Sequence, residues 1–222
     1  MMEDAVRPAD HEPHQRMSVR PGEAWALYAW VRLIRPETAV EIGRLEGISS
    51  EWILNALRDN ELQDEEQASL RTEEKRECGH LHSIDKKTTE ASKQRLAPWV
   101  AKQMVTIHEL DSHGPEAKAL AERIGTIQFL FVDGCHTADA VEADCRLWLP
   151  RVRGYVVFHD WAFEGVRVGI RRAVPLETFS RYIASNEHAV PGQVHTHGHG
   201  VMVLYLPDGL RSMPTEQPGR SG

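Results

Sequence analysis

Two aspartates follow short apolar runs that are typical of buried strands. Residues 127–132 (IQFLFV) are followed by Asp133, and residues 155–158 (YVVF) are followed by His159 and Asp160. If these runs form neighbouring strands, about 4.8 Å apart, both carboxylates can reach one divalent cation. Such a cation would keep open positions for two substrate oxygens, so the pattern predicts metal-assisted chemistry at one edge of a sheet.

The segment between the two runs has the periodicity of an amphipathic helix. Four residues of its apolar face recur at steps of three or four positions: Ala138, Val141, Cys145 and Trp148. A buried strand, a helix and a second buried strand form a right-handed βαβ unit, whose two strands are parallel. Each aspartate therefore follows the carboxyl end of its strand, which is where open α/β sheets bind ligands.

A glycine-containing turn follows the first predicted strand, residues 38–42. Glu41 lies near the end of that strand, Gly43 and Gly47 follow it, and Ser49 can cap the next helix. Glycine lets the backbone approach a ligand closely, and the amino end of a helix offers free N–H groups. The glycines are four residues apart, unlike the GxGxxG pattern of dinucleotide folds, so the turn alone does not identify a ligand.

Acidic residues also follow the other predicted parallel strands, residues 81–84 and 104–108. Carboxylates thus lie at the ends of five successive strands: Glu41, Asp85, Asp111 (with Ser112 beside it), Asp133 and Asp160. Solvation alone does not explain acids at the same edge of five strands. An acid after the second strand can accept both hydroxyls of a ribose, which makes Asp85 a candidate for nucleoside binding.

Three further segments have a predicted secondary structure that can be compared with the observed fold. Residues 88–97 are expected to form a helix that ends at Pro98, because proline interrupts helical hydrogen bonding. Two closing strands are expected near residues 193–195 and 201–206, and they could form an antiparallel hairpin at the edge of the sheet.

Length and patterning predict one domain over residues 21–206. Residues 1–20 are polar and contain two prolines, and residues 207–222 are rich in proline, glycine and serine, so both are expected to be flexible. Residues 59–77 hold eight acidic and three basic residues, which indicates a solvated helical insertion or a mobile loop.

Composition excludes several classes of partner. A hydrophobic content of 41% supports a sizeable core, and a net charge of −7 argues against binding nucleic acid. No apolar run approaches the length that spans a membrane, and the amino-terminal residues lack a signal segment. The three cysteines lack metal-type spacing, which predicts reduced thiols in a cytoplasmic protein. The composition is compatible with a homo-oligomer.

The sequence resembles the class I S-adenosylmethionine-dependent methyltransferases. The segment VEIGRLEGIS is similar to their first motif, in which an acidic residue precedes two glycines. Residues 129–161 (FLFVDGCHTADAVEADCRLWLPRVRGYVVFHDW) are similar to the metal-dependent branch that includes macrocin O-methyltransferase-like and cephalosporin-hydroxylase-like proteins. The resemblance covers roughly residues 22–175. It implies a three-layer α/β sandwich with a Rossmann-like, doubly wound, mostly parallel seven-stranded sheet and an antiparallel last strand.

The resemblance also implies a role for each candidate residue. Residues that would bind S-adenosylmethionine are Glu41, Gly43 and Gly47 at its methionine part, Asp85 at the ribose, and Asp111 and Ser112 at the adenine, with Ser49 and Asp133 as further cofactor-binding residues. Asp133 and Asp160 would hold a divalent cation, Mg²⁺ first, and His136 would act as general base. The cation would orient an acceptor hydroxyl and lower its pKa.

Two positions depart from the related enzymes. Trp161 stands where catechol-type enzymes have an asparagine ligand, and His159 stands where macrocin-type enzymes have a glutamate. The third protein ligand is therefore open, with His159 as the candidate. An imidazole ligand would shift the preference from Mg²⁺ towards Mn²⁺, Zn²⁺ or Fe²⁺.

The function that these residues predict is transfer of a methyl group from S-adenosylmethionine to a hydroxyl of a small metabolite, such as a sugar or a natural product. Three alternatives use the same features. They are an enzyme that binds this cofactor without methylating, a metal-dependent hydrolase built on the same aspartates, and a non-catalytic binding module that docks through the acidic segment.

Overall fold

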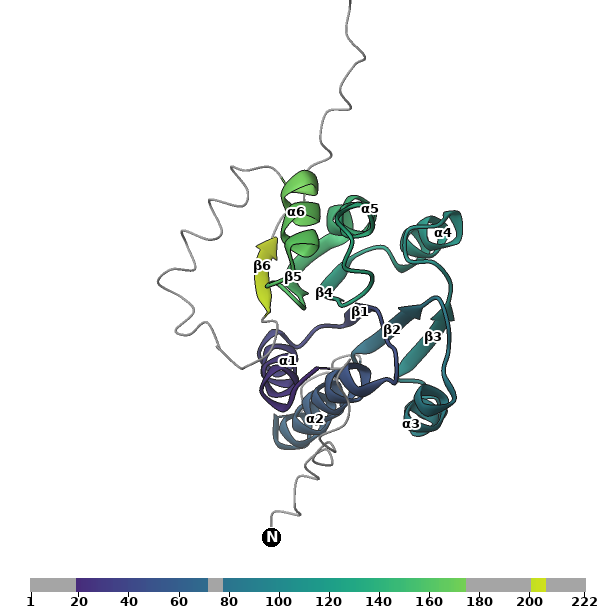
Figure 1. Cartoon of the computed structure of the whole chain (residues 1–222). Helices are drawn as coiled ribbons and strands as arrows, with labels where there is room; N and C mark the ends of the chain where they lie inside the picture. Colours follow the sequence, from purple (N-terminus) through teal and green to yellow (C-terminus); the bar gives the residue numbers. More distant parts are fainter. Residues whose placement is uncertain (1–18, 72–77, 175–200, 207–222) are drawn as a thin grey trace, which may run out of the picture.

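The computed structural model describes residues 19–71, 78–174 and 201–206. These residues form one six-stranded sheet whose strands are β1 (Thr38–Ile42), β2 (His80–Asp85), β3 (Val105–Glu109), β4 (Ile127–Val132), β5 (Val152–Phe158) and β6 (Met202–Leu206). Their order is β3-β2-β1-β4-β5-β6. The first five strands are parallel, and β6 is antiparallel to β5 (Figure 1).

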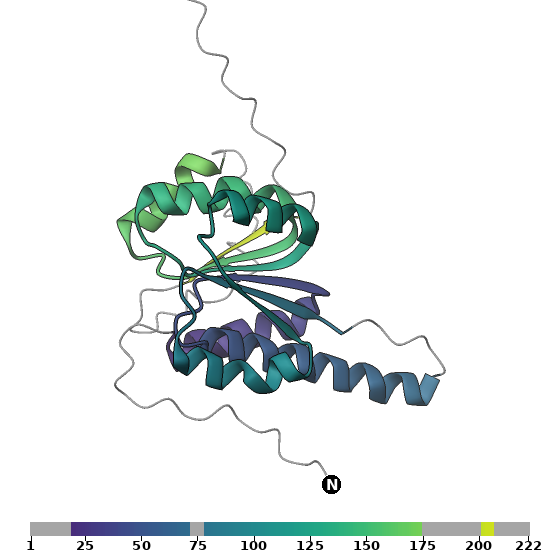
Figure 2. The same cartoon turned by 90° about the vertical axis from the view of Figure 1, so that its right-hand side faces the viewer.

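Helices cover both faces of this sheet. One face carries α1 (Pro21–Ile34), α2 (Ile48–Arg71) and α3 (Glu90–Ala101), and the other carries α4 (Pro115–Ile124), α5 (Ala138–Trp148) and α6 (Glu164–Ala173). Figure 2 shows the resulting three layers edge-on. A short 3-10 helix, η1 (Leu149–Arg151), joins α5 to β5. The predicted doubly wound, mostly parallel fold with an antiparallel last strand is confirmed.

Two expectations lie outside the described residues. The seventh strand was expected near residues 193–195, and residues 1–18 of the flexible arm and the tail (207–222) were expected at the two ends of the chain. The last two residues assigned to the arm are described: Val19 is buried in the core, and Arg20 is the N-cap of α1. The described part of the chain therefore has six strands where the sequence predicts seven.

The central strands are buried on both sides, which fixes their register. Phe129 and Phe131 of β4 pack against α1, α2 and α3, whereas Leu130 and Val132 pack against α4, α5 and α6. All four are at most 6% exposed. Because successive side chains point to opposite faces, a slip of one residue would exchange these two sets.

The winding of the sheet reverses between β1 and β4. Connections from β1 lead outward through β2 to β3, and those from β4 lead outward to β5. Doubly wound sheets bind their ligands outside the carboxyl ends of the strands at this switch point. The turn after β1 and Asp133 after β4 both lie there.

The acidic segment is partly ordered as helix. Helix α2 continues without interruption through residue 59 to Arg71, and its outer part projects beyond the rest of the domain (Figure 2). Its inner turns dock on α1, where Tyr28 donates to Asp59 at 2.7 Å and Arg35 pairs with Asp64. The sequence allowed a helical insertion or a mobile loop here, and the described part of the segment, to Arg71, is helical.

The expected end of a helix at Pro98 is wrong. Helix α3 continues through Pro98 to Ala101. Trp99 is 7% exposed within the core beneath the sheet, and Lys102 donates its backbone N–H to the carbonyl of Pro98. Burial of the following tryptophan therefore outweighs the hydrogen bond that proline cannot make.

None of the helices in the described residues combines the length and the apolar character needed to cross a membrane.

A histidine pair on β2 and β3 gives a first test of the structure. His82 Nδ1 and His108 Nε2 are 3.1 Å apart, and burial together with the neighbouring His80 and His108 lowers the pKa of His82 to about 4. As the pH falls, the imidazole of His82 is protonated in the unfolded chain at a higher pH than in the folded chain. The free energy of unfolding should therefore decrease below neutral pH. We expect His82→Gln to remove part of that decrease, about 1 kcal/mol after allowance for solvent at the half-buried ring.

Urea unfolding of both proteins at about pH 7 and about pH 5 measures this difference. Groups remote from His82 titrate equally in the two proteins, so the change between them reports on His82 and the two histidines that it contacts, His80 and His108. An identical pH dependence in the parent and the variant would contradict the assignment.

Candidate active site

The two predicted metal-binding aspartates meet at the carboxyl edge of β4 and β5. Ligand atoms of Asp133, His159 and Asp160 all lie within 4.8 Å of one another. His159 Nδ1 is 3.0 Å from Asp133 Oδ1 and 3.2 Å from Asp160 Oδ2. The three side chains offer two carboxylates and one imidazole to a shared point, which is a donor set that binds divalent cations.

Asp160 is held in an unusual conformation. Its φ is 56°, in the left-handed region that few residues other than glycine, asparagine and aspartate adopt. The backbone carbonyl of Asp160 accepts the N–H of Phe163 at 2.9 Å, which closes the turn into α6. Oδ1 of Asp160 is buried and has no hydrogen-bond partner among the described residues. An unpaired buried carboxylate oxygen is costly, and a cation would compensate it.

The cluster binds protons strongly. Burial disfavours the charged form of His159, but hydrogen bonds with Asp133, Asp160 and Glu23 outweigh burial and raise its pKa to about 12. Burial also tends to raise the pKa of Asp160, but hydrogen bonds with His136 and His159 lower it far below the usual value. The protonated imidazoles thus neutralise the charge of the carboxylates. A dication can neutralise the same charge in their place, and its binding would release protons.

His136 lies at the entrance of this cluster. Its Nε2 is 3.0 Å from Asp160 Oδ2 and 3.7 Å from Asp133 Oδ1, and hydrogen bonds to both carboxylates raise its pKa to about 9. Its ring stacks on Phe163, with centroids 5.2 Å apart and planes 17° apart. A Cβ on Gly165 would lie 2.1 Å from the His136 carbonyl, so the glycine in α6 lets that helix approach the histidine. The half-exposed imidazole is placed to exchange a proton with a bound substrate.

The glycine turn after β1 touches β4 at the residue that follows it, Asp133. Gly43 has a φ of 88°, and a Cβ there would lie 2.0 Å from the carbonyl oxygen of Asp133. The N–H of Gly43 bonds to Ile84 O at 2.9 Å, and the N–H of Asp133 bonds to Ile42 O at 2.7 Å. Gly43 is therefore required for close backbone approach between β1 and β4, and the turn and the carboxylate cluster are neighbours.

Glu41 is fully buried beneath this turn. Its carboxylate accepts hydroxyl hydrogens from Ser49 at 2.5 Å, from Ser83 at 2.6 Å and from Ser50. Burial raises the pKa of Glu41, while the three hydroxyls and the charge of Arg44 oppose that shift. Glu41 and Ser49 thus join β1 to the start of α2. Their direct contact with a cofactor stays a prediction.

Asp85 is also bound to the turn. Its Oδ2 accepts the backbone N–H groups of Arg44 at 2.8 Å and Leu45 at 2.9 Å, and Oδ1 accepts that of Lys87 at 3.1 Å. The side chain of Arg44 is 1% exposed and donates to Ser83 O at 2.9 Å. Asp85 therefore shapes the glycine turn in addition to its predicted role at a ribose.

Asp111 and Ser112 lie in the loop after β3. Asp111 is half exposed and pairs with Lys86 at 3.0 Å, beside the end of β2. Ser112 contributes its carbonyl to the indole N–H of Trp148 at 2.8 Å, which fastens the loop to α5. The structure therefore brings Asp85 and Asp111 to the β2–β3 side of the switch point, apart from the cluster at Asp133 and Asp160.

Comparison with known proteins identifies the family of this chain. The family described as a methyltransferase domain matches residues 40–161, from the first strand to the residue after Asp160. The chain belongs to this family. The expectation of a class I S-adenosylmethionine-dependent methyltransferase is thereby confirmed, and the match covers both the glycine turn and the carboxylate cluster. No curated protein sequence matches this methyltransferase.

Solved structures with the same fold are distant in sequence. CalS11, a TDP-rhamnose 3'-O-methyltransferase of calicheamicin biosynthesis, has a TM-score of 0.55 at 13% identity, over 83% of this chain and 78% of that one. An O-methyltransferase from Bacillus cereus has a TM-score of 0.51 at 16% identity, over 86% and 84%. TomG from Streptomyces achromogenes, an O-methyltransferase of tomaymycin synthesis, has 0.50 at 19%, over 85% and 82%. These likenesses show the fold.

Sequence reasoning missed one buried acid of the methyltransferase site. Glu23 in the first turn of α1 is 3% exposed, and its Oε2 lies 3.0 Å from His159 Nε2. It precedes Leu27 by four residues and Val31 by eight, so it lies on the buried stripe of the helix. A charged residue on an apolar stripe is the signal that could have identified it.

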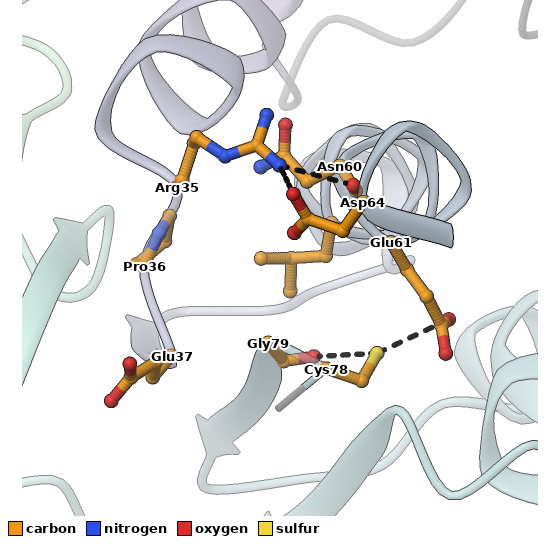
Figure 3. A pocket seen from close by; sticks show the side chains of 9 residues that line it. Arg35, Pro36, Glu37, Asn60, Glu61, Asp64, Cys78 and Gly79 are labelled. Atoms are coloured by element: carbon orange, nitrogen blue, oxygen red, sulfur yellow. Dashed lines mark hydrogen bonds and ion pairs between the residues drawn. The ribbon is translucent and has the colours of Figure 1, made fainter. Parts of the chain in front are cut away.

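A small hollow lies at the opposite edge of the sheet, at the amino ends of β1 and β2 (Figure 3). Arg35, Asn60, Asp64 and Cys78 are among its lining residues, and its volume is about 20 Å³. That space admits about one water molecule, so the hollow is too small for a nucleoside or an acceptor.

Proposed function

We propose that this methyltransferase moves the methyl group of S-adenosylmethionine to a hydroxyl oxygen of a small metabolite, with a divalent cation held by Asp133, Asp160 and His159. The observation that carries the proposal is the convergence of these three side chains beside the glycine turn at the switch point. The unpaired, buried Oδ1 of Asp160 supports a cation among them.

Methyl transfer is an in-line displacement at the sulfonium carbon. The acceptor oxygen forms a bond to the methyl carbon as the carbon–sulfur bond breaks, and the acceptor proton must leave. A bound cation supplies Lewis acidity that lowers the pKa of the acceptor hydroxyl. His136, whose Nε2 faces the carboxylate cluster, can take that proton.

The cofactor would lie along the turn from Gly43 to Gly47 and the loops after β2 and β3. Glu41 and Ser49 support this turn from below, and Asp85 holds it from the side. The hydroxyls of a ribose would share the carboxylate oxygens of Asp85 with the backbone N–H groups of the turn, or would replace those groups. The adenine would lie by Asp111 and Ser112. These assignments follow from the family resemblance and from the placement of the residues at one sheet edge.

Sugars and natural products are the first acceptors to test. CalS11 acts on a nucleotide sugar and TomG takes part in the synthesis of a natural product, according to their names. Two adjacent hydroxyls could occupy two open cation positions, so vicinal diols on sugars and catechols suit the site chemically.

Calorimetry and mass spectrometry test the proposal together. The full chain is titrated with S-adenosylmethionine and then incubated with hydroxylated acceptors, with Mg²⁺ or Mn²⁺ and with EDTA. We expect binding of the cofactor, products heavier by one methylene, and loss of product in EDTA. A chain that does not bind the cofactor but hydrolyses esters with metal would instead support the hydrolase alternative. Binding without any product would favour a non-methylating enzyme.

A further inference from the structure

Glu23 is a buried acid that the proposed reaction leaves without a role. It belongs to α1, more than a hundred residues before His159 in the chain, and contacts that histidine through Oε2. The same oxygen accepts the backbone N–H of Arg20 at 2.9 Å, which caps the helix. Oε1 is buried with no hydrogen-bond partner among the described residues. Helix α1 is thus anchored to the carboxylate cluster by one side chain.

The imidazole of His159 has a carboxylate on each side. Nε2 faces Glu23, and Nδ1 faces Asp133 and Asp160, at 3.0 and 3.2 Å. The ring is 7% exposed and packs edge-on against Phe131, so it cannot readily rotate to exchange its nitrogens. When the N–H at Nε2 donates a hydrogen bond to Glu23, the nitrogen that remains free to bind a metal is Nδ1.

We propose that Glu23 is a positioning residue that orients His159 so that Nδ1 becomes the third protein ligand of the cation at Asp133 and Asp160. This inference rests on the proposed metal-dependent function and specifies the cation. One nitrogen and two carboxylate ligands favour a transition-metal dication such as Mn²⁺, Fe²⁺ or Zn²⁺ over Mg²⁺. Histidine ligands are commonly oriented by a carboxylate on their second nitrogen, and removal of that carboxylate lowers metal affinity about 10- to 100-fold.

The chain offers a substitution that separates this role from packing. In Glu23→Gln, the amide oxygen can take the place of Oε2, because both hydrogen bonds of Glu23 use that one atom. Glutamine also serves in a helix cap. The variant therefore keeps the cap and the contact but removes the negative charge. Glu142→Gln on α5, where the glutamate pairs with Arg146, is the matched control for loss of a paired glutamate.

Metal binding to the full chain tests the inference without any substrate. Calorimetry gives the affinities for Mn²⁺, Zn²⁺ and Mg²⁺, and pulsed electron paramagnetic resonance of the Mn²⁺-loaded protein detects nitrogen bound to the metal. We expect Mn²⁺ to bind at least about tenfold more tightly than Mg²⁺, with a nitrogen coupling that His159→Gln abolishes. Mn²⁺ affinity should fall about 10- to 100-fold in Glu23→Ala, and by a smaller factor in Glu23→Gln. Glu142→Gln should bind like the parent.

The outcomes distinguish this inference from the proposed function. Parental Mn²⁺ affinity and nitrogen coupling in Glu23→Gln and Glu23→Ala would overturn the positioning role while the metal site stands. Mn²⁺ binding without any nitrogen coupling, or Mg²⁺ binding as tight as Mn²⁺, would also overturn it. A parent chain that binds none of the three cations, or binds them unchanged in Asp133→Asn, would remove the metal-dependent function itself. Loss of folding in Glu23→Ala, seen by circular dichroism, leaves Glu23→Gln to decide.

Discussion

Replacement of Asp160 by asparagine is expected to lower the rate of methyl transfer by at least about 10³-fold, because the Lewis acidity of the proposed cation would supply several kcal/mol of barrier reduction. Asparagine is chosen because it tolerates the left-handed φ of 56°, whereas alanine would strain the turn. The substitution keeps the size of the side chain and removes the charge that the cluster offers to a cation. Turnover is measured as S-adenosylhomocysteine formed per minute.

Two comparisons make this result specific. The affinity for S-adenosylmethionine should change little, because Asp160 lies on the β5 side of the switch point and the turn after β1 is untouched. Asp139→Asn is the matched control, since Asp139 lies on the surface of α5 and pairs only with Arg172 among its ion pairs in the described residues. An Asp160→Asn protein that methylates at the parental rate in EDTA would refute the metal role.

Replacement of His136 by alanine should lower turnover by about 10²- to 10⁴-fold, the usual contribution of a general base. The neutral imidazole is the active form, so the rate of the parent should rise with pH as His136 loses its proton. Asp133 and Asp160 raise the pKa of His136 to about 9. Carboxylates that bind a cation attract the imidazolium less, so we expect the rising limb of the rate profile below that value.

Phe163→Leu is the control for His136→Ala. It removes the stacked ring but leaves the imidazole, so its turnover should fall by no more than about tenfold if proton transfer is the role of His136. In His136→Ala the rising limb should disappear from the plot of kcat/KM against pH. An unchanged profile in that variant would assign the limb to another group and remove His136 as the base.

The positions of the parallel strands along the chain followed from local patterns. Each strand is a short apolar run that ends in an acidic residue or a glycine turn, and burial on both faces makes such runs easy to recognise. The limits of β5 were harder, because it begins at Val152, three residues before the predicted strand. Val152 pairs with Ile127 across a register shift in β4, and only the partner strand reveals that pairing.

Residues of the candidate site were predictable from the sequence where their place directly after a strand identified them. Asp133 and Asp160 were found in this way and His136 through the family resemblance, and the structure brings the three together. The contacts of Glu23, Arg44 and Ser83 depend on segments far apart in the chain. Nothing in the residues beside Ser83 indicates that it donates to Glu41 on the neighbouring strand. Tertiary contacts of this kind require the assembled sheet.

The contact between Gly43 and the carbonyl of Asp133 limits how this enzyme can be re-engineered. Any larger residue at position 43 would push apart two backbones that are already touching, and would displace the aspartate along with the turn. Directed evolution towards new acceptors should therefore leave that crossing alone and diversify the segment from Trp161 to Glu164, whose side chains are more exposed and follow Asp160.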